Sequence, residues 1–262
     1  MSLMLASVSN VQEAGIVFSA GVDIIDIKDS AKGALGAVEC CVVEDIVSEI
    51  AGRSLISATV GDLPMQRKCL VNAVSAMAAT GIDIVKVGIF AEEIPSEGLL
   101  AVGELAKNGI DIVLVFFADK SPRMDNFNNL AEAGVVGVMI DTADKTQGSL
   151  RSILCDNKLM EFITQAKSAG LMAGLAGSLQ VNDIEPLLQL KPDYLGFRGA
   201  LCRQYRREQA IDVMAVHRIR AMIPATSSPV DGNNKVNSLM QTVTSSQSYA
   251  NTQSEIQDIS VR

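Results

Sequence analysis

The chain has 262 residues, of which 48% are hydrophobic and 20% charged, and these proportions are ordinary for a globular protein with a sizeable core. Its formal net charge of −8 and its pI near 4.8 argue against a nucleic acid or an anionic membrane as partner. No apolar run reaches the ~18 residues that a spanning helix needs, and the N-terminus lacks the features of a secretory signal. We therefore expect a cytoplasmic protein.

The cysteine and histidine patterns give no sign of a metal protein. Five cysteines are an odd number and none has C-x-x-C or zinc-type spacing, so we expect reduced thiols. No cluster of His, Asp and Glu has metal-ligand spacing, and we expect no metal and no other cofactor. The single histidine, His217, is expected on the surface or in packing, and Met77, Met139 and Met172 are expected in the core.

A unit of strand and helix recurs along the chain. The first strand is expected at 3–8 and the first helix at 11–21. Apolar strand-like runs then follow Gly21, Gly52, Gly81, Gly109, Gly134 and Gly170, and an eighth strand is expected at 193–199. Segments with helical periodicity precede these glycines, and the last helix is expected at 207–223. Glycine in this place is typical of a helix C-cap with positive φ.

Eight apolar strands that alternate with helices predict a parallel sheet covered by helices. Eight units in about 220 residues match an α/β fold of the (β/α)8 TIM-barrel type. A doubly wound sheet is the competing arrangement, but it usually has a G-x-G-x-x-G turn after its first strand, where this chain has "SVSNVQEAG". We therefore predict a single barrel domain at 1–224.

The composition changes after Pro224. Residues 225–262 are dense in Ser, Thr, Asn and Gln and show no sustained apolar period. We predict a flexible polar C-terminal tail there, with a short docking helix as the alternative.

Polar residues stand where the expected strands end, and this end of a TIM barrel holds the active site. The second strand ends in "DIIDIK", where the period of two puts Asp26 and Lys28 on one face. The third strand runs on to Asp62, the fourth carries Lys86 between two valines in "DIVKVGIF", and the sixth supplies Asp141 and, just beyond it, Lys145. Three lysines and three aspartates are thus predicted to converge on one mouth of the barrel.

Clustered lysines indicate the chemistry of a primary amine. Apolar surroundings disfavour the charged form of an amine, and a neutral amine can attack an aldehyde or ketone to form a Schiff base. The aspartates can carry protons during a dehydration. The alternative is that Lys28–Asp26 and Lys86–Asp83 are structural ion pairs at the rim, but convergence from several strands favours catalysis.

Small residues follow the last two strands, where such barrels often bind phosphate. Gly177 and Ser178 follow the seventh strand, and Gly199 and Ala200 follow the eighth, so backbone N–H groups can approach an anion. Arg198 is expected either to contact phosphate with two N–H groups or to form an ion pair within the barrel. The simpler interpretation is that each of these glycines only allows a tight turn between strand and helix.

Six motifs occur in the order "DIIDIKDSAKGALGA", "SATVGDLP", "DIVKVGIF", "MIDTADK", "LAGSL" and "GFRGALC". In this order they resemble the (5-formylfuran-3-yl)methyl phosphate synthases, also described as 4-(hydroxymethyl)-2-furancarboxaldehyde-phosphate synthases, over residues 4–220. The resemblance implies a lyase similar to class I aldolases. It would join two molecules of glyceraldehyde 3-phosphate, with loss of phosphate and water, in the biosynthesis of a methanofuran-type cofactor of one-carbon metabolism.

The resemblance also implies roles for single residues. Lys28 would be the Schiff-base lysine, and Lys86 would be a second catalytic lysine that donates and accepts protons. Asp26, Asp141 and Lys145 match the supporting polar residues. The strand-end positions had already selected the same five residues.

The chain departs from the family pattern in two loops. Ser30 stands where a proline is expected, so the loop after the second strand is expected to be less rigid. A glycine-rich polar turn is expected after "RGALC", but the chain has "RQYRREQ" at 203–209. Our hypothesis for this segment is a phosphate loop built differently, with Arg203 or Arg206.

Two other functions stay open. One is a Schiff-base aldolase that acts on another sugar phosphate, and the other is a non-catalytic phosphate-ligand sensor that presents its tail to a partner. The expected small-molecule partner is glyceraldehyde 3-phosphate. The sequence does not fix the oligomeric state, and only the analogy with barrels that associate through their outer helices suggests a homo-oligomer.

Overall fold

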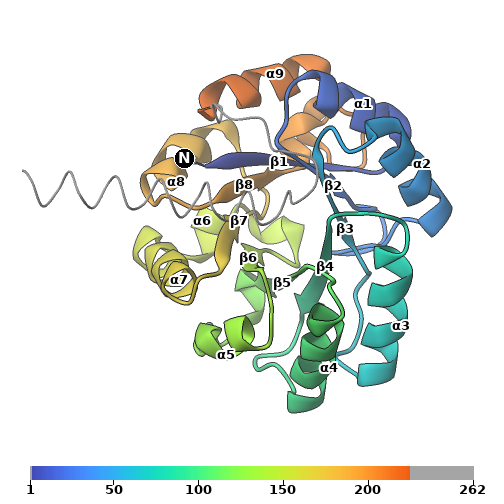
Figure 1. Ribbon diagram of the computed structural model, residues 1–262. Coiled ribbons are helices and arrows are strands. Elements are labelled where there is room, and N and C mark those ends of the chain that lie inside the picture. The colour runs from blue at the N-terminus through green and yellow to red at the C-terminus, as the bar shows by residue number, and fades with distance from the viewer. Residues whose placement is uncertain (1, 225–262) are drawn as a thin grey trace, which may run out of the picture.

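The computed structural model describes residues 2–224, and the predicted tail at 225–262 lies outside the described residues. Eight strands form a closed barrel in which every strand is parallel to its neighbours, and β1 pairs with both β2 and β8 (Figure 1). The strands are β1 (Leu3–Val8), β2 (Ile24–Ile27), β3 (Leu55–Thr59), β4 (Ile84–Ile89), β5 (Ile112–Phe117), β6 (Gly137–Asp141), β7 (Met172–Leu175) and β8 (Tyr194–Phe197). The TIM-barrel prediction is confirmed, and the doubly wound alternative is wrong.

Helices surround the barrel on its outside (Figure 1). They are α1 (Val11–Ser19), α2 (Cys40–Ile50), α3 (Arg67–Ala78), α4 (Ser96–Lys107), α5 (Phe127–Glu132), α6 (Leu150–Ile153), α7 (Asp156–Ser168), α8 (Val181–Gln189) and α9 (Val213–Met222). The six glycines expected at helix ends all have positive φ, between 72° and 94°. These angles favour glycine, because a side chain in this region is strained.

The last helix is shorter than expected. It begins at Val213 rather than at 207, because Asp212 is its N-cap and accepts a hydrogen bond from the N–H of Met214 at 2.9 Å. The preceding segment forms short turns instead, and Cys202 pairs with Ile211 in an antiparallel bridge. His217 is exposed on α9, as expected. Residues 203–212 therefore form a loop at the end of the barrel and not the first turns of α9.

Two hydrophobic cores hold the fold together. One fills the inside of the barrel and includes Leu5, Ile24, Met139 and Met172. The larger core lies between the strands and the helices and includes Met77. Strand residues alternate between these two cores, so both faces of each strand are apolar. This explains why the strands appear in the sequence as continuous hydrophobic runs.

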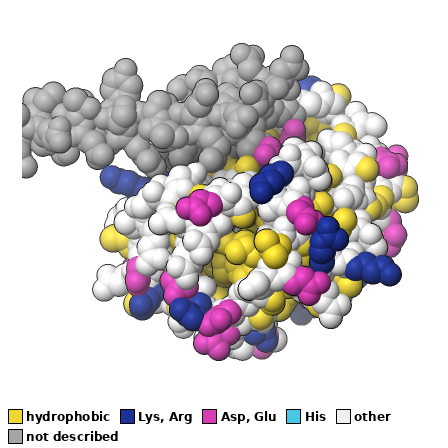
Figure 2. Space-filling model, turned by 60° about the horizontal axis from the view of Figure 1, so that its bottom comes forward, with side chains coloured by type: hydrophobic (Ala, Val, Ile, Leu, Met, Phe, Trp, Pro, Cys, Tyr) yellow, Lys and Arg dark blue, Asp and Glu magenta, His cyan; other side chains and the backbone are white. Residues whose placement is uncertain are grey.

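The outer surface mixes charges of both signs. On the face shown in Figure 2, acidic and basic side chains are interspersed among apolar ones. The net charge of the chain is therefore not gathered into one acidic patch on this face. No helix within residues 2–224 is long and apolar enough to cross a bilayer.

One glycine is required by the packing inside the barrel. Gly174 of β7 lies opposite Tyr194 of β8, and a Cβ at Gly174 would lie 2.1 Å from the tyrosine ring. Tyr194 is 3% exposed, so its ring has little room to move.

Gly174→Ala should therefore lower the free energy of unfolding by about 1–3 kcal/mol, because the added methyl group overpacks the barrel. Urea denaturation measures this change. Gly15→Ala in α1 is the control, since no atom lies within 4 Å of its ideal Cβ and alanine favours helix by up to about 1 kcal/mol. Equal stability of Gly174→Ala and the wild type would contradict the packing argument.

Candidate active site

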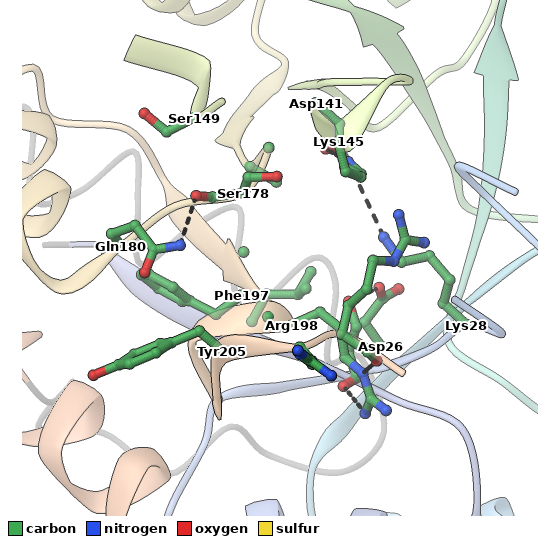
Figure 3. A pocket seen from close by; sticks show the side chains of 18 of the residues that line it. Asp26, Lys28, Asp141, Lys145, Ser149, Ser178, Gln180, Phe197, Arg198 and Tyr205 are labelled. Carbon is green, nitrogen blue, oxygen red and sulfur yellow. Dashed lines mark hydrogen bonds and ion pairs between the residues drawn. The ribbon is translucent and has the colours of Figure 1, made fainter. Parts of the chain in front are cut away.

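The carboxyl ends of the strands open into a cavity of about 500 Å³ (Figure 3). Its walls come from β1, β2, β6 and β8 and from the loops that follow β2, β6, β7 and β8. Eight of the eleven site residues expected from the sequence line it: Asp26, Lys28, Asp141, Lys145, Gly177, Ser178, Arg198 and Gly199. Lys86, Asp62 and Ala200 are not among the lining residues.

Asp26 of β2 is a fully buried carboxylate on the floor of the cavity. Its Oδ1 lies 2.6 Å from Lys86 Nζ and accepts a hydrogen bond from Ser57 Oγ at 2.8 Å. Its Oδ2 accepts from Ser7 Oγ at 2.8 Å. Burial by itself would raise the pKa of Asp26, but the charges of Lys86 and Lys28 outweigh burial and lower it. Asp26 therefore stays ionised at neutral pH.

Lys86 of β4 lies behind Asp26 and is 2% exposed. Burial lowers its pKa, the charge of Asp26 opposes this effect, and the charge of Lys28 adds to it. The alternative of rim pairs Lys28–Asp26 and Lys86–Asp83 is wrong in its pairing, because Lys86 pairs with Asp26 and Lys28 pairs with Asp141. Asp83 instead accepts a hydrogen bond from the backbone of β3.

Asp141 at the end of β6 lies between the other two lysines. Its Oδ1 is 2.5 Å from Lys145 Nζ, and its Oδ2 is 3.7 Å from Lys28 Nζ. Burial would raise the pKa of Asp141, but the charges of Lys145 and Lys28 hold it well below its usual range. Burial lowers the pKa of Lys145, and the charges of Lys28 and Arg207 add to this effect while Asp141 opposes it.

The three lysines differ in how their amines are occupied. Lys145 donates hydrogen bonds to Asp141, to the Thr142 carbonyl and to Thr142 Oγ1, and Lys86 is held against Asp26. The Lys28 side chain is 7% exposed and lines the cavity. With the described residues its amine makes only the ion pair at 3.7 Å, which is too long for a hydrogen bond. Of the three amines, that of Lys28 is therefore the one available to a ligand.

The loop after β7 lies across the cavity from the lysines. Figure 3 shows Ser149, Ser178 and Gln180 on the opposite side from Lys28 and Lys145. Gly177 has φ +109°, and a Cβ there would lie 2.8 Å from Thr142. The N–H groups of Gly177 and Ser178 donate to no described residue, so two neighbouring donors are free for a ligand.

Arg198 forms the ion pair within the barrel that was one of its two expected roles. Its Nη1 is 2.6 Å from Glu13 Oε2, and its Nη2 donates to Glu13 Oε1 at 3.2 Å. Its guanidinium also donates to the carbonyl groups of Ser7 and Arg207. Glu13 could not be singled out from the sequence, because its spacing from Asn10 by itself indicates only the start of a helix.

Asp62 and Ala200 lie outside the cavity lining. Asp62 accepts hydrogen bonds from the N–H groups of Ala34 at 3.2 Å and Leu35 at 2.9 Å, so it fixes the loop after β2. Ala200 is 1% exposed and belongs to the outer core. The structure therefore does not bring these two residues to the ligand cavity.

The segment after β8 contributes residues that strand-end positions do not identify. Tyr205, Arg206, Arg207 and Glu208 line the cavity, whereas Arg203 does not. The basic run in "RQYRREQ" was the available signal, but only the tertiary structure shows which arginines face the cavity. Within the described residues, no group of three or more His, Cys, Asp or Glu side chains could hold a metal ion.

The barrel and the residues that line its cavity define a TIM-barrel protein with a polar site at the carboxyl ends of its strands. Phosphoribosyl anthranilate isomerase from Thermus thermophilus has a similar fold, with a TM-score of 0.60 and 12% identity over 85% of this chain and 98% of that chain. At this identity the likeness concerns the fold alone.

The family model described as 4-HFC-P synthase matches residues 4–220. The chain belongs to this family. It is 32% identical to the (5-formylfuran-3-yl)methyl phosphate synthase of Methanosarcina mazei, over 76% of this chain and 90% of the relative. It is 39% identical to a Methylorubrum extorquens protein to which the same name is provisionally assigned, over 83% of this chain and 92% of the relative.

The paired charges of Asp141 predict a pH dependence of stability. The folded-state pKa of Asp141 lies below the ordinary value of 3.8, so the unfolded chain takes up this proton at a higher pH than the folded chain. The stabilisation is therefore complete above about pH 5 and is lost as the pH falls through the folded-state pKa.

Asp141→Asn should lower the free energy of unfolding at pH 7 by about 3–5 kcal/mol, because it leaves two lysines without their carboxylate. The difference from the wild type should shrink as the pH falls from 5 to 3. Urea denaturation at several pH values measures it, with Asp45→Asn on the exposed face of α2 as the control. A difference that stays constant over this range would contradict the assigned pairing.

Proposed function

We propose that this protein is a (5-formylfuran-3-yl)methyl phosphate synthase. It is a lyase that condenses two molecules of glyceraldehyde 3-phosphate through a Schiff base on Lys28. The family membership supports the reaction, and the single observation that carries the assignment of the nucleophile is the unoccupied amine of Lys28 in the cavity. The two other lysines of the site are held by carboxylates.

In the first step, the lone pair of Lys28 Nζ attacks the carbonyl carbon of a triose phosphate, and water leaves as the iminium forms. The triose is glyceraldehyde 3-phosphate or its dihydroxyacetone isomer formed in place. Asp141, with an oxygen 3.7 Å from Lys28 Nζ, is close enough to orient the amine and to offset the charge of the iminium. Its second oxygen is held by Lys145, which fixes the carboxylate in place.

In the second step, loss of a proton from the carbon beside the iminium forms an enamine, and this carbon attacks the aldehyde of the second molecule. Asp26 is the proposed proton acceptor at the floor of the cavity. Lys86 lies behind Asp26 at 2.6 Å and would exchange the proton with it, so Lys86 acts on the substrate through Asp26. The resulting alkoxide receives a proton from the same set of groups.

Ring closure and elimination complete the reaction. One phosphate leaves as inorganic phosphate, two molecules of water are lost overall, and hydrolysis of the imine releases Lys28. Two triose phosphates then balance one furan aldehyde phosphate, one phosphate and two waters, with no net oxidation or reduction. The chemistry therefore needs no redox cofactor, and we propose that none is used and that no metal takes part.

The phosphate that stays on the product is proposed to bind at the loops after β7 and β8. Gly177, Ser178 and Gly199 line the cavity there, and the N–H groups of Gly177 and Ser178 donate to no described residue. Arg198 would act indirectly, because Glu13 already holds its guanidinium. We further propose that the enzyme acts in the cytoplasm, in the biosynthesis of a methanofuran-type cofactor.

Borohydride reduction in the presence of glyceraldehyde 3-phosphate should trap the substrate on the peptide that contains Lys28. Lys28→Arg should form no adduct and no product, because a guanidinium keeps the charge but stays protonated. Peptide mass spectrometry measures the adduct, with Lys158→Arg on the exposed face of α7 as the control. An adduct on another lysine in the wild type would remove Lys28 from its role.

Purified protein and glyceraldehyde 3-phosphate alone should yield a product that absorbs in the near ultraviolet, because the furan ring is conjugated with the aldehyde. An aldolase that needs another sugar phosphate would leave the substrate unchanged under these conditions. A non-catalytic sensor would bind the substrate and raise the melting temperature without turnover. Mass analysis of the product distinguishes these outcomes.

A further inference from the structure

The cavity carries a surplus of positive charge in an acidic protein. Five basic and three acidic residues line it, which leaves two positive charges more than negative ones. The chain as a whole has a net charge of −8. A positive cavity in an acidic protein favours an anionic ligand. The low-dielectric walls of the cavity concentrate the electric field of its positive charges inside it.

Pairing within the cavity shows where this surplus lies. Lys145 forms an ion pair with Asp141, and Arg198 forms one with Glu13. Arg207 Nε is 4.0 Å from Glu208 Oε1, which is beyond hydrogen-bond distance. Arg206 forms no hydrogen bond or ion pair through its side chain with any described residue. Apart from Lys28, the cations of the cavity that no carboxylate among residues 2–224 holds within hydrogen-bond distance are therefore Arg206 and Arg207.

Arg207 is held in position although most of its N–H groups are free. Its Nη2 donates to the Gly33 carbonyl at 3.0 Å, which leaves its other N–H groups without an acceptor among residues 2–224. The backbone carbonyl of Arg207 accepts from Ser30 Oγ and from Arg198 Nε, both at 2.9 Å. Its side chain is 19% exposed. A guanidinium that is fixed before a ligand arrives loses less entropy on binding it.

The two loops that depart from the family pattern are thus joined to each other. Ser30 belongs to the loop after β2, which follows Lys28, and Arg207 belongs to the segment after β8. Ser30 and Gly33 together hold Arg207 against the loop that carries the proposed nucleophile. The charge of Arg207 also contributes to lowering the pKa of Lys145.

We propose that Arg206 and Arg207 form a second anion subsite, which binds the phosphate of the second triose phosphate. This inference rests on the proposed function, in which two phosphorylated molecules must occupy one cavity. The N–H groups of Gly177 and Ser178 supply one phosphate position, and the segment after β8 supplies the other. Guanidinium groups suit this task, since they donate two parallel hydrogen bonds to phosphate oxygens.

Arg206→Ala is the sharpest test, because the Arg206 side chain has no hydrogen-bond or ion-pair partner among residues 2–224 whose loss would disturb the loop. Arg203→Ala is the matched control, since Arg203 is exposed on the same segment but does not line the cavity. Arg207→Lys is a second variant that keeps the charge but loses the planar fork.

Calorimetric titration measures the affinity for inorganic phosphate. In Arg206→Ala this affinity should fall about tenfold or more at one of two sites, and in Arg207→Lys it should fall less. Arg203→Ala should bind phosphate as the wild type does. Identical titrations for Arg206→Ala and the wild type would overturn the subsite. An equal loss in Arg203→Ala would overturn it as well, because diffuse surface charge would then explain the binding.

Trapping and turnover separate the two substrate positions. In Arg206→Ala the borohydride adduct on Lys28 should form as in the wild type, while the KM for product formation should rise about tenfold or more. Equal losses of adduct and product would overturn the assignment to the second substrate. Unchanged kinetics with weakened phosphate binding would mean an adventitious ion only, which also overturns it.

The phosphate titration is independent of turnover, so it also separates this inference from the proposed function. If the wild type forms neither adduct nor furan product, the proposed function fails. The titrations of Arg206→Ala and Arg203→Ala still decide whether the anion subsite exists.

Discussion

Two buried carboxylates, Asp26 and Asp141, hold the polar end of this barrel together. A charge in a barrel interior is costly unless it is paired and hydrogen-bonded. Asp26 is paired with Lys86 and two serine hydroxyls, and Asp141 is paired with Lys145 and faces Lys28. Each carboxylate therefore makes it possible to bury an ammonium group, that of Lys86 within β4 and that of Lys145 after β6.

This pairing gives different roles to three lysines that look equivalent in sequence. Lys86 and Lys145 each lie against a carboxylate oxygen, within 2.6 Å, whereas Lys28 is 3.7 Å from its partner and borders the cavity. In the proposed reaction, both tightly paired lysines keep their carboxylates ionised, and Lys86 also exchanges a proton with Asp26. The loosely held amine forms the covalent bond to substrate.

The loops above the barrel set the character of the cavity more than the strands do. A solved barrel with 12% identity shares the fold, so the strands alone do not distinguish this family from others. In this chain the segment after β8 brings Arg206 and Arg207 to the cavity beside Arg198, and Ser30 ties that segment to the loop after β2. Specificity for two phosphorylated substrates, as proposed, would then depend on loop residues that a strand-end search does not find.

The sequence by itself determined the eight strands, the helix-ending glycines, the positions of Asp26, Lys28, Asp141 and Lys145 at strand ends, and the position of Lys86 within its strand. Hydrophobic period and backbone preference are local properties, so they can be read along the chain. Only the tertiary structure decided that Lys86 pairs with Asp26 rather than with Asp83, and that Glu13 takes up Arg198. It also decided that Asp62 holds a loop and that Arg206 and Arg207, but not Arg203, face the cavity. Pairing of charges depends on distances between strands and loops far apart in sequence, and these distances exist only once the barrel has closed.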